Sequence, residues 1–280
     1  MSTDRLLFDT PGPRGRHRIR IATAVSTVVL IALIAAGIRQ FAANGQLDWN
    51  RWQPFTNLAL MRYLFQGLIG TVQAAVVSIM FAMAGGVVLA LGRLSSRRLL
   101  RWPAYAYVEI MRTIPALLLI YVMLFALPRY GFDLPVFWKL VIPLSVSSAA
   151  SFAVIFRAGV LSLDKGQGEA GLAIGLTYGQ TMRYIVLPQA VRRLLPAIIS
   201  QSVGLLKDTS LGYIVSYNEL LFSGQVVTSF THRLIQTYII VAVIYLVVNG
   251  SLSKVARTLE ARQQSTLSAG RSVRADPDAA

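Results

Sequence analysis

The sequence contains no cysteine, only two histidines and few charged residues for its length of 280. The absence of cysteine excludes disulfide bonds, thiolate zinc sites and cysteine nucleophiles together. Charged side chains make up 14% of the residues, whereas soluble domains carry about a quarter because their surfaces must be hydrated. This deficit argues against a soluble enzyme and indicates a chain that is surrounded by lipid.

Apolar residues, in contrast, make up 55% of the chain. A helix needs roughly 17–25 mostly apolar residues to cross the hydrocarbon core of a bilayer. Six apolar segments meet or approach this length, the third and fifth with interruptions: 21–38, 63–91, 113–128, 140–156, 194–206 and 234–253. The sequence therefore predicts an all-α integral membrane protein with about six transmembrane helices.

The basic residues indicate which way these helices face. The chain has 27 lysines and arginines against 12 aspartates and glutamates, a formal net charge of +15. Nineteen of these cations lie in the two terminal segments or in the second and fourth connections, and six lie in the alternate connections. Cytoplasmic connections of membrane proteins carry the excess of positive charge, so both termini are predicted to be cytoplasmic. This placement accounts for the net charge without nucleic-acid binding.

Composition assigns the segments around the main apolar runs. Residues 1–20 are a basic cytoplasmic N-terminus, and 21–38 are either a retained transmembrane helix or a cleaved signal, of which the length favours the first. Residues 39–62 are rich in tryptophan and are predicted to lie at the external interface. Residues 261–280 are predicted to be a disordered cytoplasmic tail.

The sequence offers no residue set suited to catalysis or metal binding. The two histidines, His17 and His232, fall on opposite sides of the predicted membrane, so they cannot share a metal site or a catalytic triad. Residues 166–171 fit the dinucleotide pattern G-x-G-x-x-G, but a predicted membrane helix precedes them and no acidic residue occurs between Leu172 and Lys207. No P-loop pattern occurs either. We expect no catalytic residue, metal or cofactor in this chain.

The long cytoplasmic connection, 157–193, has the composition of folded structure. Asp164 is placed to cap a short helix over 168–175, in which Gly171 and Gly175 would share one face. Glycine costs about 1 kcal/mol within a helix, so its abundance here suggests a surface that another protein approaches closely. The alternative is a hairpin that packs on its own bundle.

A second short helix is predicted in the same connection. Thr177 and Gln180 have the spacing of a capping box, so the helix should begin there, and Pro188 should end it. The two helices would form a compact knob with a small-residue face exposed to the cytoplasm.

These residues resemble a known motif. Glu169-Ala-Gly171, followed by Gly175 and by 185–190, is similar to the cytoplasmic "EAA" loop of importer-type ABC permeases. Further matches at 165–167, 206–211 and 219–220 resemble the polar amino-acid branch of that family. Several ordered motifs at consistent spacing make the resemblance more specific than any one of them.

The resemblance implies a five-helix core over 63–260, preceded by one extra helix, with a coupling loop over 159–193. This chain would be a transport subunit of a prokaryotic cell membrane, and ATP and Mg²⁺ would bind a partner ATPase pair. A second permease, identical or different, would complete the pore, and an extracytoplasmic binding protein would deliver the amino acid. The residues that would dock on the ATPase are Glu169, Ala170, Gly171, Ala173, Ile174, Gly175, Leu187 and Pro188.

Smaller features of the same resemblance bear on the substrate. The branch commonly has an acidic residue three positions before Arg157, where this chain has Val154, which weakens the case for a cationic substrate. Segments 132–135, 161–167 and 216–220 are most similar to actinobacterial glutamate-importer permeases. The resemblance thus implies glutamate, with glutamine, aspartate or arginine as alternatives. An ATPase-independent channel or structural protein is the contrasting class.

Two groups of ionisable residues lie in or beside predicted membrane helices. Lys207 and Asp208 interrupt the fifth apolar segment and, with Thr209 and Ser210, are candidates for the translocation path. The alternative is a structural break held by the partner subunit. Glu109 and Arg112 are three residues apart on a predicted helix and are expected to form a structural ion pair.

Overall fold

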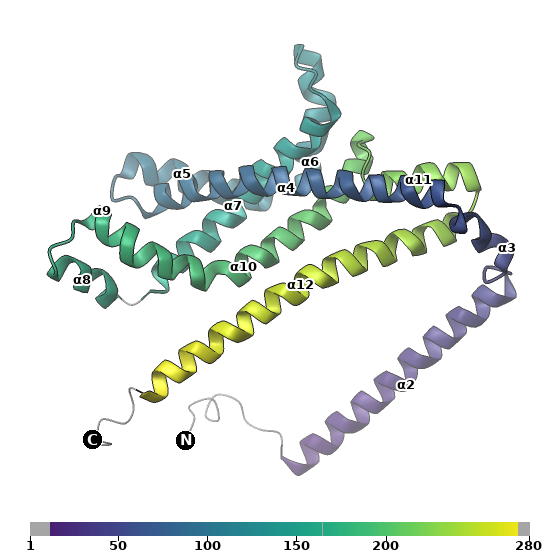
Figure 1. Ribbon diagram of the computed structural model, residues 1–280, viewed down its shortest axis with the longest axis horizontal. Coiled ribbons are helices and arrows are strands. Elements are labelled where there is room, and N and C mark those ends of the chain that lie inside the picture. The colour runs from purple at the N-terminus through teal and green to yellow at the C-terminus, as the bar shows by residue number, and fades with distance from the viewer. Residues whose placement is uncertain (1–11, 164, 274–280) are drawn as a thin grey trace. The chain divides into compact units, whose positions relative to one another are not determined.

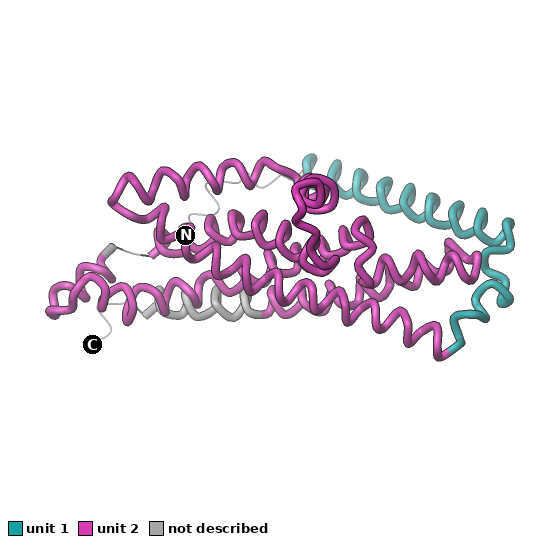
Figure 2. The backbone as a smooth tube through the Cα atoms, turned by 90° about the horizontal axis from the view of Figure 1, so that it is seen from above, with its two compact units in different colours: residues 1–57 teal, residues 58–280 magenta. Residues whose placement is uncertain are grey.

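The computed structural model describes residues 12–163 and 165–273, and every regular element in this part of the chain is a helix (Figure 1). The chain divides into two compact units, residues 1–57 and 58–280 (Figure 2). The predicted all-α membrane fold is confirmed. Four helices are long and apolar enough to cross a bilayer, and a bent pair can supply a fifth span.

Unit 1 contains the N-terminal span. Helix α2 covers Pro13–Ala43, longer at both ends than the predicted 21–38, because its proline occupies the first turn and the arginines that follow are good helix formers. Helix α3 (Trp49–Trp52) and the 3₁₀ turn η1 (Gln53–Thr56) follow. Here Arg51 and Trp52 donate hydrogen bonds to the side-chain and backbone oxygens of Gln46, at 2.9 and 3.0 Å. The predicted interfacial stretch is therefore a folded turn.

Unit 2 is built on two long helices that pack along each other, α4 (Leu58–Leu94) and α7 (Val136–Leu161). Small residues bring them together, since a Cβ at Gly86 would lie 2.6 Å from the Cβ of Phe152. Leu140 and Leu144 of α7 are fully or almost fully buried beside Ala74 of α4. Helix α10 (Leu187–Asp208), the 3₁₀ segment η5 (Thr209–Val215), α11 (Leu220–Thr231) and α12 (Leu234–Val273) complete the unit.

The third predicted span is a bent pair. Helix α5 (Arg98–Thr113) meets α6 (Ala116–Tyr121), which continues into η2 (Val122–Ala126) and η3 (Leu127–Tyr130), at an angle of 95°. Pro115 explains the break, because it has no backbone N–H and disfavours the helical conformation at the residue before it. Ile114 accordingly has φ −82° and ψ 122°. Figure 1 shows that the α4–α5 connection and α8 share one end of unit 2, as expected for two connections on one membrane side.

The fifth predicted span and the tail differ from expectation. Helix α10 is not among the apolar spans of the described residues; it includes Arg192 and Arg193 and ends with Lys207 and Asp208. Helix α12 continues to Val273, whereas a disordered tail was predicted over 261–280. The reason is that 254–269 contain no proline or glycine and are rich in Leu, Ala, Arg and Gln, which favour helix. Residues 274–280 lie outside the described part of the chain.

Candidate functional site

The cytoplasmic knob, defined here as residues 165–186, consists of α8 (Lys165–Ala173), α9 (Tyr178–Thr181) and the π-helical turn η4 (Met182–Val186). The predicted capping box is confirmed: the backbone N–H of Gln180 donates to Thr177 Oγ1, and the N–H of Thr177 donates to Gln180 Oε1 at 2.9 Å. Asp164, the predicted cap of α8, lies outside the described residues. The knob is thus a folded helical pair.

Two hydrogen bonds fasten the knob and its approach to α10. The Gln189 side chain donates to Gln167 Oε1 at 2.9 Å, and the Arg193 guanidinium donates to the carbonyl oxygen of Ser162 at 2.8 Å. Leu163, Val186 and Ala190 form a small buried cluster beneath them. The knob and the residues just before it are therefore packed against the start of α10.

Gly171 faces the interior of the knob. A Cβ at this position would lie 2.6–2.8 Å from the side chain of Thr181 and 3.0 Å from Ile185. The glycine allows α8 to pack closely on α9 and η4, so for this residue the hairpin alternative is the correct one. Gly171 therefore offers no exposed surface to a partner protein.

The prediction that Gly171 and Gly175 share one helical face is wrong. Helix α8 ends at Ala173, and Gly175 has φ +87°, in the left-handed region. The N–H of Gly175 donates to Leu172 O at 3.0 Å and that of Leu176 donates to Gly171 O at 3.2 Å. This pair of bonds is the Schellman arrangement, for which glycine is the preferred residue. Gly175 ends the helix rather than extending it.

The exposed apolar surface of the knob comes from larger residues. Leu172 is 50% exposed, Ile174 75% and Tyr178 72%. Glu169, Ala170 and Ala173, three of the predicted docking residues, are also exposed. A protruding group of aliphatic and aromatic side chains is typical of a protein interface.

Pro188 does not end the second helix. Leu187 and Pro188 are the first two residues of α10, and the helical path is continuous from Tyr178 to Asp208. The π turn η4 precedes the proline, and its i→i+5 bond from Leu187 N to Met182 O replaces the regular pattern at that point. A widened turn accommodates the ring and the missing N–H group. Both residues are exposed on the side of the knob.

The four residues predicted to line the translocation path do not all lie on the same surface. Lys207 and Asp208 are the last residues of α10 and are exposed. Thr209 is fully buried and donates to Leu206 O at 2.6 Å. Lys207 and Ser210 line a common groove that also involves α12. The structure thus brings two of the four together and turns Thr209 into the core.

A buried carboxylate that the sequence analysis missed joins two helices, α11 and α12. Glu219 is 0% exposed. Its Oε1 accepts from the N–H of Phe222 at 2.7 Å, and its Oε2 accepts from the N–H of Leu221 at 2.7 Å and from Tyr245 Oη at 2.9 Å. The side chain therefore caps α11 and fastens it to α12. An acidic residue directly before an apolar helical run is the signal that predicts such a cap.

Helix α4 completes this junction. Thr71 Oγ1 accepts from the N–H of Leu220 at 3.0 Å, and Gly70 O accepts from Tyr217 Oη at 3.2 Å. A Cβ at Gly70 would overlap the carbonyl oxygen of Asn218. Only glycine permits this approach, so the junction depends on backbone contact as well as on Glu219.

Comparison with known proteins identifies the family. Residues 82–265 match the family described as "Binding-protein-dependent transport system inner membrane component". The chain belongs to this family. The permease is 39% identical over 226 residues, 78% of its length and 82% of the other, to the glutamate transport system permease protein GluD of Corynebacterium glutamicum. It is also 35% identical to the probable glutamine ABC transporter permease protein GlnP of Bacillus subtilis. That match extends over 206 residues, which are 72% of this chain and 94% of GlnP.

A solved structure agrees with these relatives. The crystal structure of an amino acid ABC transporter with histidines matches the permease with a TM-score of 0.69 and 29% identity, over 74% of this chain and 97% of the other. The permease is therefore a multi-pass inner-membrane subunit of a polar amino-acid ABC importer. It is not itself an ATPase, and family membership implies an ATPase and a binding protein as partners.

The ion pair predicted within α5 of the permease is wrong. Glu109 Oε1 lies 3.5 Å from a guanidinium nitrogen of Arg93, on α4, rather than pairing with Arg112. The same guanidinium lies 5.3 Å from the ring centroid of Tyr105. Because α5 packs against α4, a cation at the end of α4 reaches the carboxylate on the inner side, whereas Arg112 lies exposed near the end of α5.

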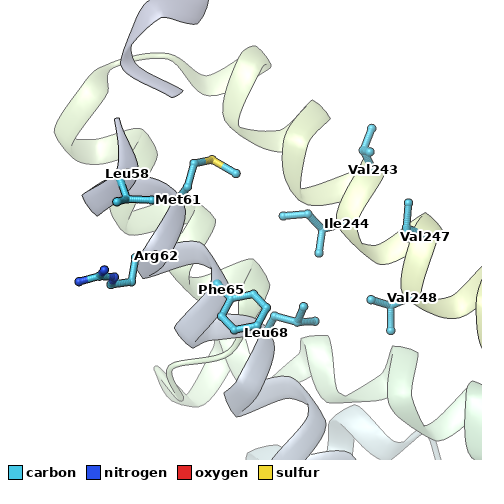
Figure 3. A pocket seen from close by; sticks show the side chains of 9 residues that line it. All are labelled: Leu58, Met61, Arg62, Phe65, Leu68, Val243, Ile244, Val247 and Val248. Carbon is cyan, nitrogen blue, oxygen red and sulfur yellow. The ribbon is translucent and has the colours of Figure 1, made fainter. Parts of the chain in front are cut away.

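The permease also has an apolar groove between α4 and α12, of about 590 Å³. Phe65 and Leu68 of α4 face Ile244 and Val248 of α12, and Figure 3 shows the side chain of Arg62 directed away from α12. All the other lining side chains are apolar. A zwitterionic amino acid would find no hydrogen-bonding partner there, so this groove is not suited to the substrate.

Proposed function

We propose that the permease forms the membrane path of an importer for glutamate. The observation that carries this proposal is its 39% identity to the glutamate permease of C. glutamicum, against 35% and 31% for the glutamine and arginine permeases of B. subtilis. Two features of the chain agree: Val154 takes a place where the branch commonly has an acid, and Lys207 supplies a cation beside a groove. Both favour an anionic substrate over a cationic one.

We further propose that the knob docks on the partner ATPase. Its exposed residues Leu172, Ile174 and Tyr178 offer apolar area to bury, and its bonds to α10 provide mechanical continuity. ATP and Mg²⁺ would bind the ATPase pair, whose closure would displace the knob and rock the helices between inward-open and outward-open forms. A second permease subunit, of the same or another kind, would complete the pore.

Reconstitution tests both substrate and coupling. The permease is assembled with its ATPase and binding protein in proteoliposomes, and uptake of radiolabelled glutamate is measured against unlabelled glutamate, aspartate, glutamine and arginine. Glutamate should compete best and uptake should require ATP. Stronger competition by glutamine or arginine would refute the substrate, and equal uptake without ATP would favour the channel alternative.

A further inference from the structure

A polar stripe runs along α12, which is otherwise apolar enough to cross a membrane. Tyr245, Asn249, Ser253 and Arg257 recur every fourth residue and therefore lie near one face of the helix. With a rise of 1.5 Å per residue, they extend over about 18 Å. Polar groups at membrane depth are costly against lipid and usually face protein or a water-filled path.

The stripe lines a groove opposite the end of α10. The groove has a volume of about 600 Å³, and Lys207 and Ser210 line its other side. This size is typical of small-molecule sites. Gly250 adds open space, since no atom lies within 4 Å of a Cβ placed there. The groove is thus a cleft of mixed polar and apolar lining alongside a predicted membrane span, and it is more polar than the groove of Figure 3.

The charges in this groove have one sign. Lys207 and Arg257 are its cations, and no aspartate or glutamate is among its lining residues. Glu219 lies close by through Tyr245, but its two carboxyl oxygens already accept three hydrogen bonds. Asp208, next to Lys207, and Glu219, behind Tyr245, lie outside the lining and offset part of this positive charge, but the charged side chains that line the groove are both cations, which favours carboxylates.

Asn249 also lines the groove. Its side-chain amide nitrogen donates to Tyr245 O at 2.8 Å, which directs Oδ1 away from that bond. Asn249 Oδ1 is buried and has no hydrogen-bond partner among the described residues. Because this oxygen has almost no accessible surface, a ligand in the groove would not reach it, and Asn249 belongs to the lining rather than to the ligand contacts.

We infer that this groove is the path of an acidic amino acid along α12. Lys207 binds a carboxylate, and Arg257 binds a carboxylate nearer the predicted cytoplasmic end. The inference rests on the proposed glutamate import and adds the residues that select the side-chain carboxylate. Glutamine, which lacks that charge, would gain less from either cation.

The absence of cysteine in the natural chain makes a labelling test clean. Ser253→Cys places a thiol in the groove, and Ser251→Cys places a matched thiol two residues away, off the groove lining and exposed. In the full complex, a water-soluble maleimide should label Cys at 253, and glutamate should slow that labelling threefold or more while glutamine slows it less. Labelling at 251 should not respond to glutamate. An unreactive thiol at 253, or one that glutamate does not protect, would overturn the inference.

A transport comparison separates this inference from the proposed function. Lys207→Met should raise the KM for glutamate tenfold or more and lower the preference for glutamate over glutamine, whereas Lys254→Met, on α12 but outside the groove, should change neither by more than twofold. If the unaltered complex does not import glutamate, the proposed function fails. If it does, and Lys207→Met keeps the same KM and preference, only the groove inference fails.

Discussion

Replacing Glu219 should destabilise the permease more than replacing any exposed acid. Glu219→Ala leaves three donors without their acceptor: the N–H groups of Leu221 and Phe222 and the hydroxyl of Tyr245. A buried donor without a partner costs about 1–3 kcal/mol, so the lower estimate is about 3 kcal/mol for the three. In a chain of this size, that corresponds to a fall in melting temperature of about 6 °C or more.

The assay is thermal unfolding of the purified permease in detergent, followed by the loss of the monodisperse peak in size-exclusion chromatography. Tyr245→Phe removes one of the three hydrogen bonds and should give an intermediate shift. Glu169→Ala, at an exposed position on the knob, is the matched control and should leave the melting temperature unchanged. A melting temperature for Glu219→Ala within 2 °C of the control would refute the view that this carboxylate holds α11 to α12.

Three further predictions concern the knob, the α4 junction and α5. The Gly175→Arg variant should insert into the membrane normally, but its ATP hydrolysis should be uncoupled from uptake. Gly175→Asn should retain more transport, because asparagine tolerates a positive φ. Normal uptake by the arginine variant would contradict docking at this loop. Gly70→Ala should lower the melting temperature by several degrees, because the added Cβ overlaps a backbone carbonyl. Gly204→Ala should leave the melting temperature unchanged, because its Cβ meets no atom within 4 Å. Equal melting temperatures for the two variants would refute the close contact at Gly70. Glu109→Gln should cost less than about 1 kcal/mol, and Arg112→Gln, which has no part in the pair, should cost nothing measurable by the same unfolding assay.

Features that depend on neighbouring residues were predictable from the sequence. The capping box of Thr177 and Gln180 is a pattern of four consecutive residues. The apolar spans likewise follow from composition over a single helix. In each case, the physical cause lies within one or two helical turns of the residue concerned.

Features that depend on tertiary packing were not predictable in this way. The carboxylate of Glu109 had a plausible partner three residues away, but α5 packs on α4 and brings a cation from 16 residues earlier. Tyr245 is 26 residues from Glu219, and Thr71 is 149 residues from Leu220. No local pattern specifies such pairs, so the junction of α4, α11 and α12 emerges only in three dimensions.

The position of α10 connects the two candidate sites. Near its start, Gln189 is hydrogen-bonded to Gln167 of the knob and Arg193 to Ser162 just before the knob, and its last residues include Lys207, which lines the groove beside α12. A 22-residue helix spans about 33 Å, and the helix is continuous between these ends although Pro196 removes one of its backbone hydrogen bonds. Movement of the knob would therefore displace Lys207 through one continuous element, without a relay of side chains. The glycines first assigned to the docking surface serve the folding of the knob, which leaves Ile174 and its exposed neighbours as the residues whose replacement should weaken docking without unfolding it.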